Sequence, residues 1–163
     1  MKEKIHVLYV DDDPHLLEIG KLYLEKGGQF TVDTLLSAIG ALEKLTTEQY
    51  DAIISDYQMP DMDGIVFLKQ IKASGNITPF IIFTGRGREE VIIEALNEGA
   101  DFYLQKGGDL KSQFADLSNK IRYAVKQRQT ESALRESEEK FREIFDTIND
   151  GVHIQEITPD GKP

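Results

Sequence analysis

The sequence contains no cysteine, and this absence excludes disulfide bonds and thiolate metal sites. The chain is therefore compatible with a reducing cytoplasm. Long apolar runs are missing as well, since no stretch approaches the roughly 20 apolar residues that cross a bilayer. The apolar part of the amino terminus, Ile5 to Val10, is too short for a signal peptide and is followed at once by acidic residues. We expect a cytoplasmic chain without a membrane segment.

Positive charge is also in short supply. The chain has 19 Lys and Arg residues against 29 Asp and Glu, which gives a formal net charge of −10. The deficit is not local, because residues 127–163 alone hold five basic and nine acidic side chains. Residues 1–126 hold the other 14 basic and 20 acidic side chains, so neither part has the basic character of a surface that binds nucleic acid or an anionic membrane. If so acidic a protein handles phosphate, it needs a metal ion or a local cation to do so.

Apolar runs and helix-type patterns alternate along residues 5–125. The runs predict strands at 5–10, 30–35, 51–55, 80–83 and 101–105. Helix signals lie between them, such as Asp13-Pro14, where Asp can cap a helix and Pro can occupy its first position. Strict alternation with short connections predicts an α/β fold with a doubly wound, five-stranded parallel sheet. The leading strand order is the flavodoxin-like 2-1-3-4-5.

The carboxyl-terminal third has a different character. No glycine or proline interrupts residues 109–148, so we predict one long helix or two nearly continuous ones. Within residues 126–140 only Ala133 and Leu134 are apolar, and a helix this polar is either solvated or paired with a copy of itself. Beyond it we predict a turn, a short strand over Val152–Ile157 and another turn. The expected divisions are a domain at 1–125, a helical linker and possible coiled coil at 126–148, and a terminal piece at 149–163.

Polar residues follow four of the predicted strands. Asp11 and Asp12 follow the first, Asp56 the third, Thr84 ends the fourth and Lys106 follows the fifth. The carboxyl ends of parallel strands share one edge of a sheet, which is where ligands bind in open α/β folds. Three carboxylates there would repel each other, at about 4 kcal/mol for each pair at about 4 Å and an effective dielectric near 20. We therefore expect a cation among them.

Oxygen ligands select a hard cation, and Mg²⁺ suits a site with one or two carboxylates, waters and a phosphate oxygen. Lys106 adds a second positive charge, and Thr84 offers a hydroxyl donor. A carboxylate beside Mg²⁺, a lysine and a hydroxyl is equipped to attack phosphorus as a nucleophile. The pattern thus favours phosphoryl transfer to an aspartate.

These motifs resemble the receiver domain of two-component response regulators. The matching segments, in the family's order and spacing, are Val10-Asp11-Asp12, Asp56 with Met59 to Gly64, Thr84-Gly85 and Tyr103 to Lys106. The resemblance implies that Asp56 is the phosphoacceptor, with Mg²⁺ as cofactor and a histidine kinase or phosphotransfer protein as partner. It also implies self-catalysed phosphorylation and dephosphorylation rather than the turnover of a conventional enzyme.

The resemblance extends to individual roles. Asp11 and Asp12 form the acidic pair, Lys106 and Thr84 contact the phosphoryl group, and Thr84 and Tyr103 form the switch pair. The implied magnesium ligands are Asp12, Asp56 and the backbone carbonyl of Gln58, with Asp11 acting through water. Gln58 and Arg86 occupy the positions that tune dephosphorylation.

One position departs from the family pattern. The family usually has a proline with a cis bond after its lysine, whereas Gly107-Gly108 follow Lys106 here. A cis bond before a residue other than proline costs about 2.5–4 kcal/mol. The sequence leaves open whether the Lys106-Gly107 bond is cis.

The carboxyl-terminal residues resemble the opening of a PAS domain. The similarity covers residues 137–151, the following predicted strand and residues 159–162. It implies that the chain is part of a longer protein, which could be a histidine kinase, and that the helix carries the switch to a PAS output. A homodimer through that helix is a possible partner state.

Two other functions remain open from the sequence. A haloacid-dehalogenase-like phosphatase also uses a strand-end Asp and Mg²⁺, and Asp11-x-Asp13 is the relevant feature. That family, however, usually has Thr or Val at the position that His15 occupies here, and the sequence shows no insertion for its cap domain. The second alternative is a dimerisation scaffold whose acidic site is vestigial.

Overall fold

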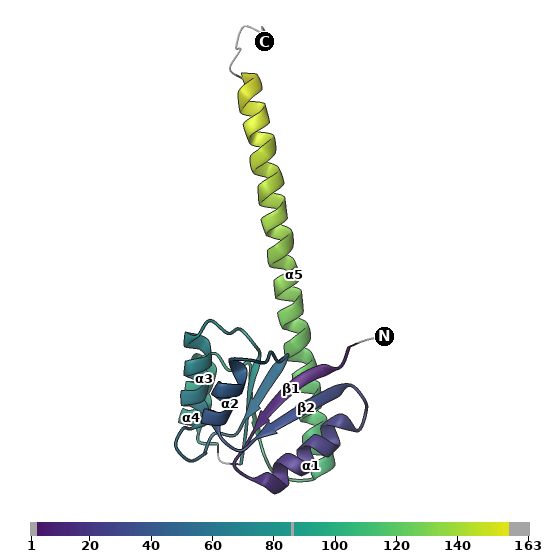
Figure 1. Cartoon of the computed structure of the whole chain (residues 1–163), viewed down its shortest axis with the longest axis vertical. Coiled ribbons are helices and arrows are strands. Elements are labelled where there is room, and N and C mark those ends of the chain that lie inside the picture. Colours follow the sequence, from purple (N-terminus) through teal and green to yellow (C-terminus); the bar gives the residue numbers. More distant parts are fainter. Residues whose placement is uncertain (1–2, 86, 157–163) are drawn as a thin grey trace. The chain divides into compact units, whose positions relative to one another are not determined.

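The computed structural model describes residues 3–85 and 87–156, and its strands and helices alternate throughout (Figure 1). In chain order they are β1 (Ile5–Val10), α1 (Pro14–Glu25), β2 (Phe30–Leu35), α2 (Ala38–Leu45), β3 (Ala52–Ser55), α3 (Gly64–Ala73), β4 (Phe80–Thr84), α4 (Glu89–Asn97), β5 (Phe102–Gln105) and α5 (Leu110–Glu156). All strand pairs are parallel, and the order is β2-β1-β3-β4-β5. The predicted fold class and strand order are confirmed.

The sheet separates two apolar cores. Alternate residues of a strand face opposite sides, so Leu8 and Ile53 pack with α2, α3 and α4, whereas Val7 and Ile54 pack with α1 and the first turns of α5. Helices on both faces leave β3, β4 and the last four residues of β1 buried. This double burial explains why these strands are continuous apolar runs in the sequence.

Side-chain caps begin four of the helices, including α5, where an Asp109 carboxylate oxygen accepts from the backbone N–H of Ser112 at 3.1 Å. Asp13 Oδ1 accepts hydrogen bonds from the backbone N–H groups of His15 and Leu16 at 3.0 and 3.2 Å. Ser37 Oγ caps α2 in the same way, and Asp63 Oδ1 caps α3. Such caps satisfy N–H groups that have no partner within the helix. The helix start predicted at Asp13 is therefore confirmed.

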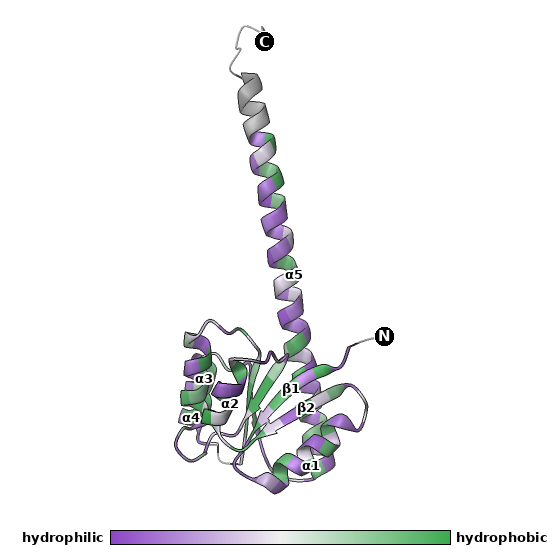
Figure 2. Ribbon diagram, viewed as in Figure 1, coloured by the Kyte–Doolittle hydropathy of each residue, from purple (hydrophilic) through white to green (hydrophobic). Residues whose placement is uncertain are grey.

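The chain divides into two compact units, Met1–Val125 and Lys126–Pro163, with α5 running through the division. In the first unit α5 buries Phe114, Leu117 and Ile121 in the core. In the second, most side chains up to Asn149 are exposed, and polar residues predominate with isolated apolar ones between them (Figure 2). Among the described residues, no helix has the length and apolar character needed to cross a membrane.

The strand predicted over Val152–Ile157 is wrong for its described part. Residues 152–156 continue α5, and Ile157 lies outside the described residues. A strand needs a neighbouring strand to pair its backbone N–H and C=O groups, whereas a helix pairs them within its own segment. The β-branched residues of this segment misled the sequence prediction, because β propensity depends on sheet context.

Candidate functional site

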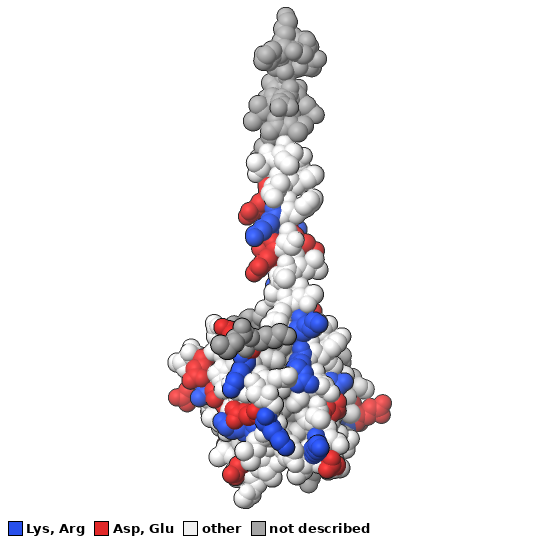
Figure 3. All heavy atoms as spheres, turned by 90° about the vertical axis from the view of Figure 1, so that its right-hand side faces the viewer, with Lys and Arg blue, Asp and Glu red and all other residues white. Residues whose placement is uncertain are grey.

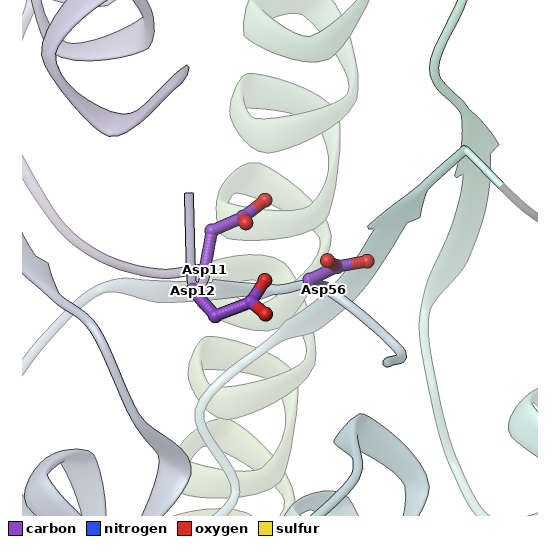
Figure 4. Close-up of side chains that lie close together, drawn as sticks. All are labelled: Asp11, Asp12 and Asp56. Atoms are coloured by element: carbon purple, nitrogen blue, oxygen red, sulfur yellow. The ribbon is translucent and has the colours of Figure 1, made fainter. Parts of the chain in front are cut away.

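The carboxyl ends of β1 and β3 bring three carboxylates together. These strands are neighbours, with Val10 paired to Ser55, and the backbone N–H of Asp56 donates to the carbonyl of Val10 at 2.9 Å. Asp11 and Asp56 are the next residues after that pair and Asp12 is the one after Asp11, and their side chains lie close together (Figure 4). One carboxylate oxygen from each lies within 4.8 Å of the others. These three side chains therefore lie close together, as the sequence predicts.

Asp11 is the buried member of this group. Its residue has no solvent exposure, and its carboxylate accepts hydrogen bonds from the backbone N–H of Asp13 at 3.0 Å and from Lys106 Nζ at 2.6 Å. Burial raises the pKa of Asp11 above its usual value, and the hydrogen bond from Lys106 opposes that rise without cancelling it. Both oxygens of Asp11 are thus already engaged by the protein.

Lys106 links two of the three carboxylates. Its ammonium group lies 2.6 Å from Asp11 Oδ2 and 3.4 Å from Asp56 Oδ2, and its side chain is 18% exposed. The backbone N–H of Lys106 donates to the carbonyl of Thr84 at 2.8 Å, which fixes the lysine beside the end of β4. Lys106 is therefore the local cation that the acidic cluster requires.

The segment after Lys106 turns without the cis-proline that is usual in the family. There is no cis peptide bond among the described residues, so the Lys106-Gly107 bond is trans. Gly107 and Gly108 have φ values of 146° and 78°, a region that glycine enters at little cost. The Gln113 side chain donates a hydrogen bond to the Gly107 carbonyl at 2.9 Å and ties this turn to α5.

Asp56 is held by its own loop. Its Oδ1 accepts a hydrogen bond from the backbone N–H of Tyr57 at 2.8 Å. The residue is buried, with 8% of its surface exposed. The loop returns at Gly64, whose N–H donates to the Tyr57 carbonyl at 2.7 Å. A Cβ at Gly64 would lie 2.3 Å from the Asp56 carbonyl oxygen, so only glycine fits there. In the sequence Gly64 appears only as the end of the motif that follows Asp56, and nothing there indicates this contact.

Thr84 and Tyr103 lie on the neighbouring strands. Thr84 ends β4 with 2% exposure, and Tyr103 in β5 is partly buried against the core. The Tyr103 hydroxyl lies so near Gly87 that a Cβ on this glycine would come within 2.8 Å of it. Burial, followed by the charge of Asp56 and by Tyr57, raises the pKa of Tyr103 above its usual value. Arg86 lies outside the described residues.

An open hollow adjoins the acidic cluster. Its volume is about 400 Å³, and its lining includes Asp12, Gln58 and Asp63. Asp12 is exposed and lines this hollow. The donor set of three carboxylates is the kind that suits Mg²⁺ rather than a soft metal. The residues present therefore fit the ion that the sequence predicts.

Comparison with known proteins gives one consistent answer. A family model described as the response regulator receiver domain matches residues 7–118. The response regulator Rre1 of Synechocystis sp. is 30% identical over 150 residues, which cover 91% of this chain and 63% of that protein. The transcriptional regulatory protein FixJ of Bradyrhizobium diazoefficiens is 32% identical over 124 residues, which cover 76% of this chain and 60% of FixJ. The chain spans less than two thirds of these relatives.

Solved structures give the same result for the fold. The receiver domain of the Francisella response regulator 1452 has a TM-score of 0.70 at 30% identity, covering 77% of this chain and 99% of its own. A CheY-like receiver domain protein from Methanospirillum hungatei has a TM-score of 0.72 at 29% identity, covering 79% of this chain and 99% of its own. Both matches extend over nearly the whole of the compared chain.

Proposed function

The chain belongs to the response regulator receiver domain family, and on that premise we propose that Asp56 accepts a phosphoryl group from a histidine kinase or phosphotransfer protein with Mg²⁺ in the site. The observation that carries the proposal is the surrounding of Asp56. Its carboxylate lies within 4.8 Å of those of Asp11 and Asp12 and 3.4 Å from the ammonium group of Lys106. A nucleophile, a place for a divalent ion and a fixed cation thus meet at one sheet edge.

The residues divide the work of transfer. An oxygen of Asp56 forms a bond to phosphorus while the bond from phosphorus to the donor's imidazole nitrogen breaks, and that nitrogen keeps the electron pair and takes up a proton. Lys106 offers its ammonium group to the oxygens of the transferred group, and Thr84 contributes its hydroxyl. When bound, Mg²⁺ supplies further positive charge to those oxygens.

The contacts of Asp11 support a distinction between residues that bind the ion directly and one that binds it through water. Lys106 and the Asp13 N–H already occupy its two oxygens, which favours a contact to the ion through water. Asp12 and Asp56, with the backbone carbonyl of Gln58, are the proposed direct ligands. Asp12 and Gln58 line the same hollow, as such a ligand pair requires.

The proposed output runs from the switch residues into α5. Thr84 and Tyr103 respond to the phosphoryl group on Asp56 and shift a two-state equilibrium that involves α4, β5 and α5. We assign residues 1–125 to the receiver, 126–148 to a signalling helix and 149–163 to the start of a PAS domain of a longer protein. Residues 157–163 of that last piece lie outside the described residues. Gln58 and Arg86 are assigned to tuning dephosphorylation.

A mass measurement tests the phosphoacceptor. Protein incubated with Mg²⁺ and a small acyl phosphate should gain the mass of one phosphoryl group, detected by intact mass spectrometry. Asp56→Asn is the matched control, because it keeps the side-chain shape and removes the nucleophile. No adduct on the wild type, or an equal adduct on Asp56→Asn, would refute the assignment.

The phosphatase alternative has less support from the geometry. It requires the carboxylate of Asp13 at the site, but Asp13 Oδ1 caps α1 through His15 and Leu16. A scaffold with a vestigial site would not need Lys106 placed between two buried carboxylates. Both alternatives predict that the wild type gains no stable phosphoryl adduct on Asp56.

A further inference from the structure

An apolar stripe on α5 lies open to solvent between Lys126 and Asn149. Leu134, Phe141, Ile144 and Ile148 are 59%, 69%, 59% and 56% exposed. Their spacings of seven, three and four residues place them on one side of the helix, at the positions that form the seam of a coiled coil. Charged side chains gather along one edge of α5, beside a strip of uncharged ones (Figure 3).

Three polar residues, Gln127, Thr130 and Ser137, also fall on this seam. With Leu134 and Phe141 at the first core position of each heptad, Thr130 and Ser137 occupy the second, as Ile144 does one heptad later. The Thr130 hydroxyl donates to the Lys126 carbonyl of its own helix at 2.9 Å. Burying Thr130 against a partner helix would therefore leave no unpaired donor.

The charges beside the seam distinguish between pairing orientations. Glu131 and Glu138 flank it on one side, and Lys126 and Lys140 flank it on the other. In a parallel pair each flank meets the opposite flank of the partner, which sets Lys126 against Glu131 of the second copy. In an antiparallel pair each flank meets its own kind, so carboxylates would face carboxylates and ammonium groups would face ammonium groups. The pattern favours the parallel pair.

The aromatic residues fit the same arrangement. Phe145 follows on the flank of the glutamates, and its ring stacks on Phe141 with centroids 6.2 Å apart. A parallel partner brings Lys140 to that flank, where a lysine can lie over an aromatic face. The exposed apolar surface of this helix is therefore widest around Phe141 and Phe145, and it becomes narrower toward the polar Thr130.

We propose that residues 126–148 of two copies of this chain pair as a parallel, in-register, two-stranded coiled coil. The sequence left open whether this helix is solvated or paired, and the exposed stripe with its charge pattern selects a second copy as the occupant. Pairing requires neither Mg²⁺ nor phosphorylation of Asp56. It deepens the proposed output, because a dimer would join the two receiver units through one pair of helices.

Cysteine cross-linking tests both pairing and orientation in the full chain. The protein has no native cysteine, so each variant reports only on the introduced thiol. Thr130→Cys and Ile144→Cys lie at equivalent seam positions 14 residues apart, about 21 Å along the helix. Equivalent residues of a parallel pair face each other, so under mild oxidation both variants should form disulfide-linked dimers. Ser132→Cys, on the opposite side of the helix, is the control and should stay monomeric on a non-reducing gel.

The possible failures are distinct. An antiparallel pair would link Thr130→Cys to Ile144→Cys in a mixture but would not link both variants to themselves. Equal cross-linking of Ser132→Cys would show random collision. Either result overturns the proposal. Cross-linking that is unchanged in an Asp56→Asn background is expected, so the outcome does not depend on the phosphoacceptor assignment.

Sedimentation gives an independent measurement. Wild type should sediment as a dimer whose dissociation constant rises on the order of threefold to tenfold in Lys126→Glu, since two exposed pairs are lost. Lys126→Glu with Glu131→Lys should restore the wild-type value, and Phe141→Glu should give a monomer that remains folded by circular dichroism. A wild type that stays monomeric at concentrations of about 0.1 mM, far above those at which natural coiled coils pair, would also overturn the proposal.

Discussion

Replacing Lys106 by methionine should destabilise the receiver more than its position near the surface suggests. Methionine keeps most of the side-chain stem and removes the charge. At an effective dielectric near 20, a positive charge contributes about 6 kcal/mol at 2.6 Å from Asp11 and about 5 kcal/mol at 3.4 Å from Asp56. The cost of removing Lys106 from water offsets much of this attraction. Breaking a buried pair by removing one partner typically costs about 3–5 kcal/mol.

We therefore expect the free energy of unfolding of Lys106→Met to fall by about 3 kcal/mol near neutral pH without Mg²⁺. The assay is urea denaturation followed by circular dichroism, with the midpoint and slope compared. Lys69→Met is the matched control, since Lys69 pairs with Glu94 and Glu98 at 3.6 and 3.9 Å and is 46% exposed. Exposed pairs contribute less than about 1 kcal/mol.

The same variant has a defined pH dependence. The pKa of Asp11 is already raised above 3.8, so ionising Asp11 costs the folded state more than the unfolded state. That cost is absent below pH 3.8 and complete above the folded pKa, and losing Lys106 enlarges it. The difference between wild type and Lys106→Met should shrink as the pH falls, and added Mg²⁺ should recover part of it. If Lys106→Met lost no more stability than Lys69→Met near neutral pH, the reasoning would be refuted.

Three further predictions follow from single contacts. Gly64→Ala should cost about 1–3 kcal/mol and slow adduct formation on Asp56, because its Cβ would lie 2.3 Å from the Asp56 carbonyl oxygen; unchanged denaturation and labelling would contradict this. Asp63→Ala should cost about 1 kcal/mol in urea denaturation by removing the α3 cap, with Asp63→Asn losing less. Although burial raises the pKa of Asp33, hydrogen bonds from Tyr50 and His6 lower it below 3.8 overall. The resulting stability is present above pH 3.8 and lost as the pH falls through the folded pKa, so the advantage of wild type over Asp33→Asn should disappear in acid, and an advantage that grew there would contradict the assignment.

The order of strands and the edge that carries the site could be predicted because their signals are local. Doubly buried strands are short apolar runs, caps are single residues such as Asp13, and the polar residues at the carboxyl ends of β1, β3 and β4 can be read directly from the sequence. Parallel strands with short crossovers then place those residues at one edge. The meeting of Asp11, Asp12 and Asp56 therefore follows from the strand pattern alone.

Other features could not be predicted because they depend on segments far apart in the chain. Lys106 and Asp11 are separated by 95 positions, and only the packed sheet sets the ammonium group 2.6 Å from one carboxylate and 3.4 Å from another. The fit of Gly64 against the Asp56 backbone depends on the path of the loop rather than on its composition. The helical conformation of residues 152–156 also became clear only in the folded structure. A strand exists only where another strand pairs with it, whereas a helix needs nothing beyond its own residues. Sequence by itself therefore determined the elements and their polar ends, and the tertiary structure decided the distances between them.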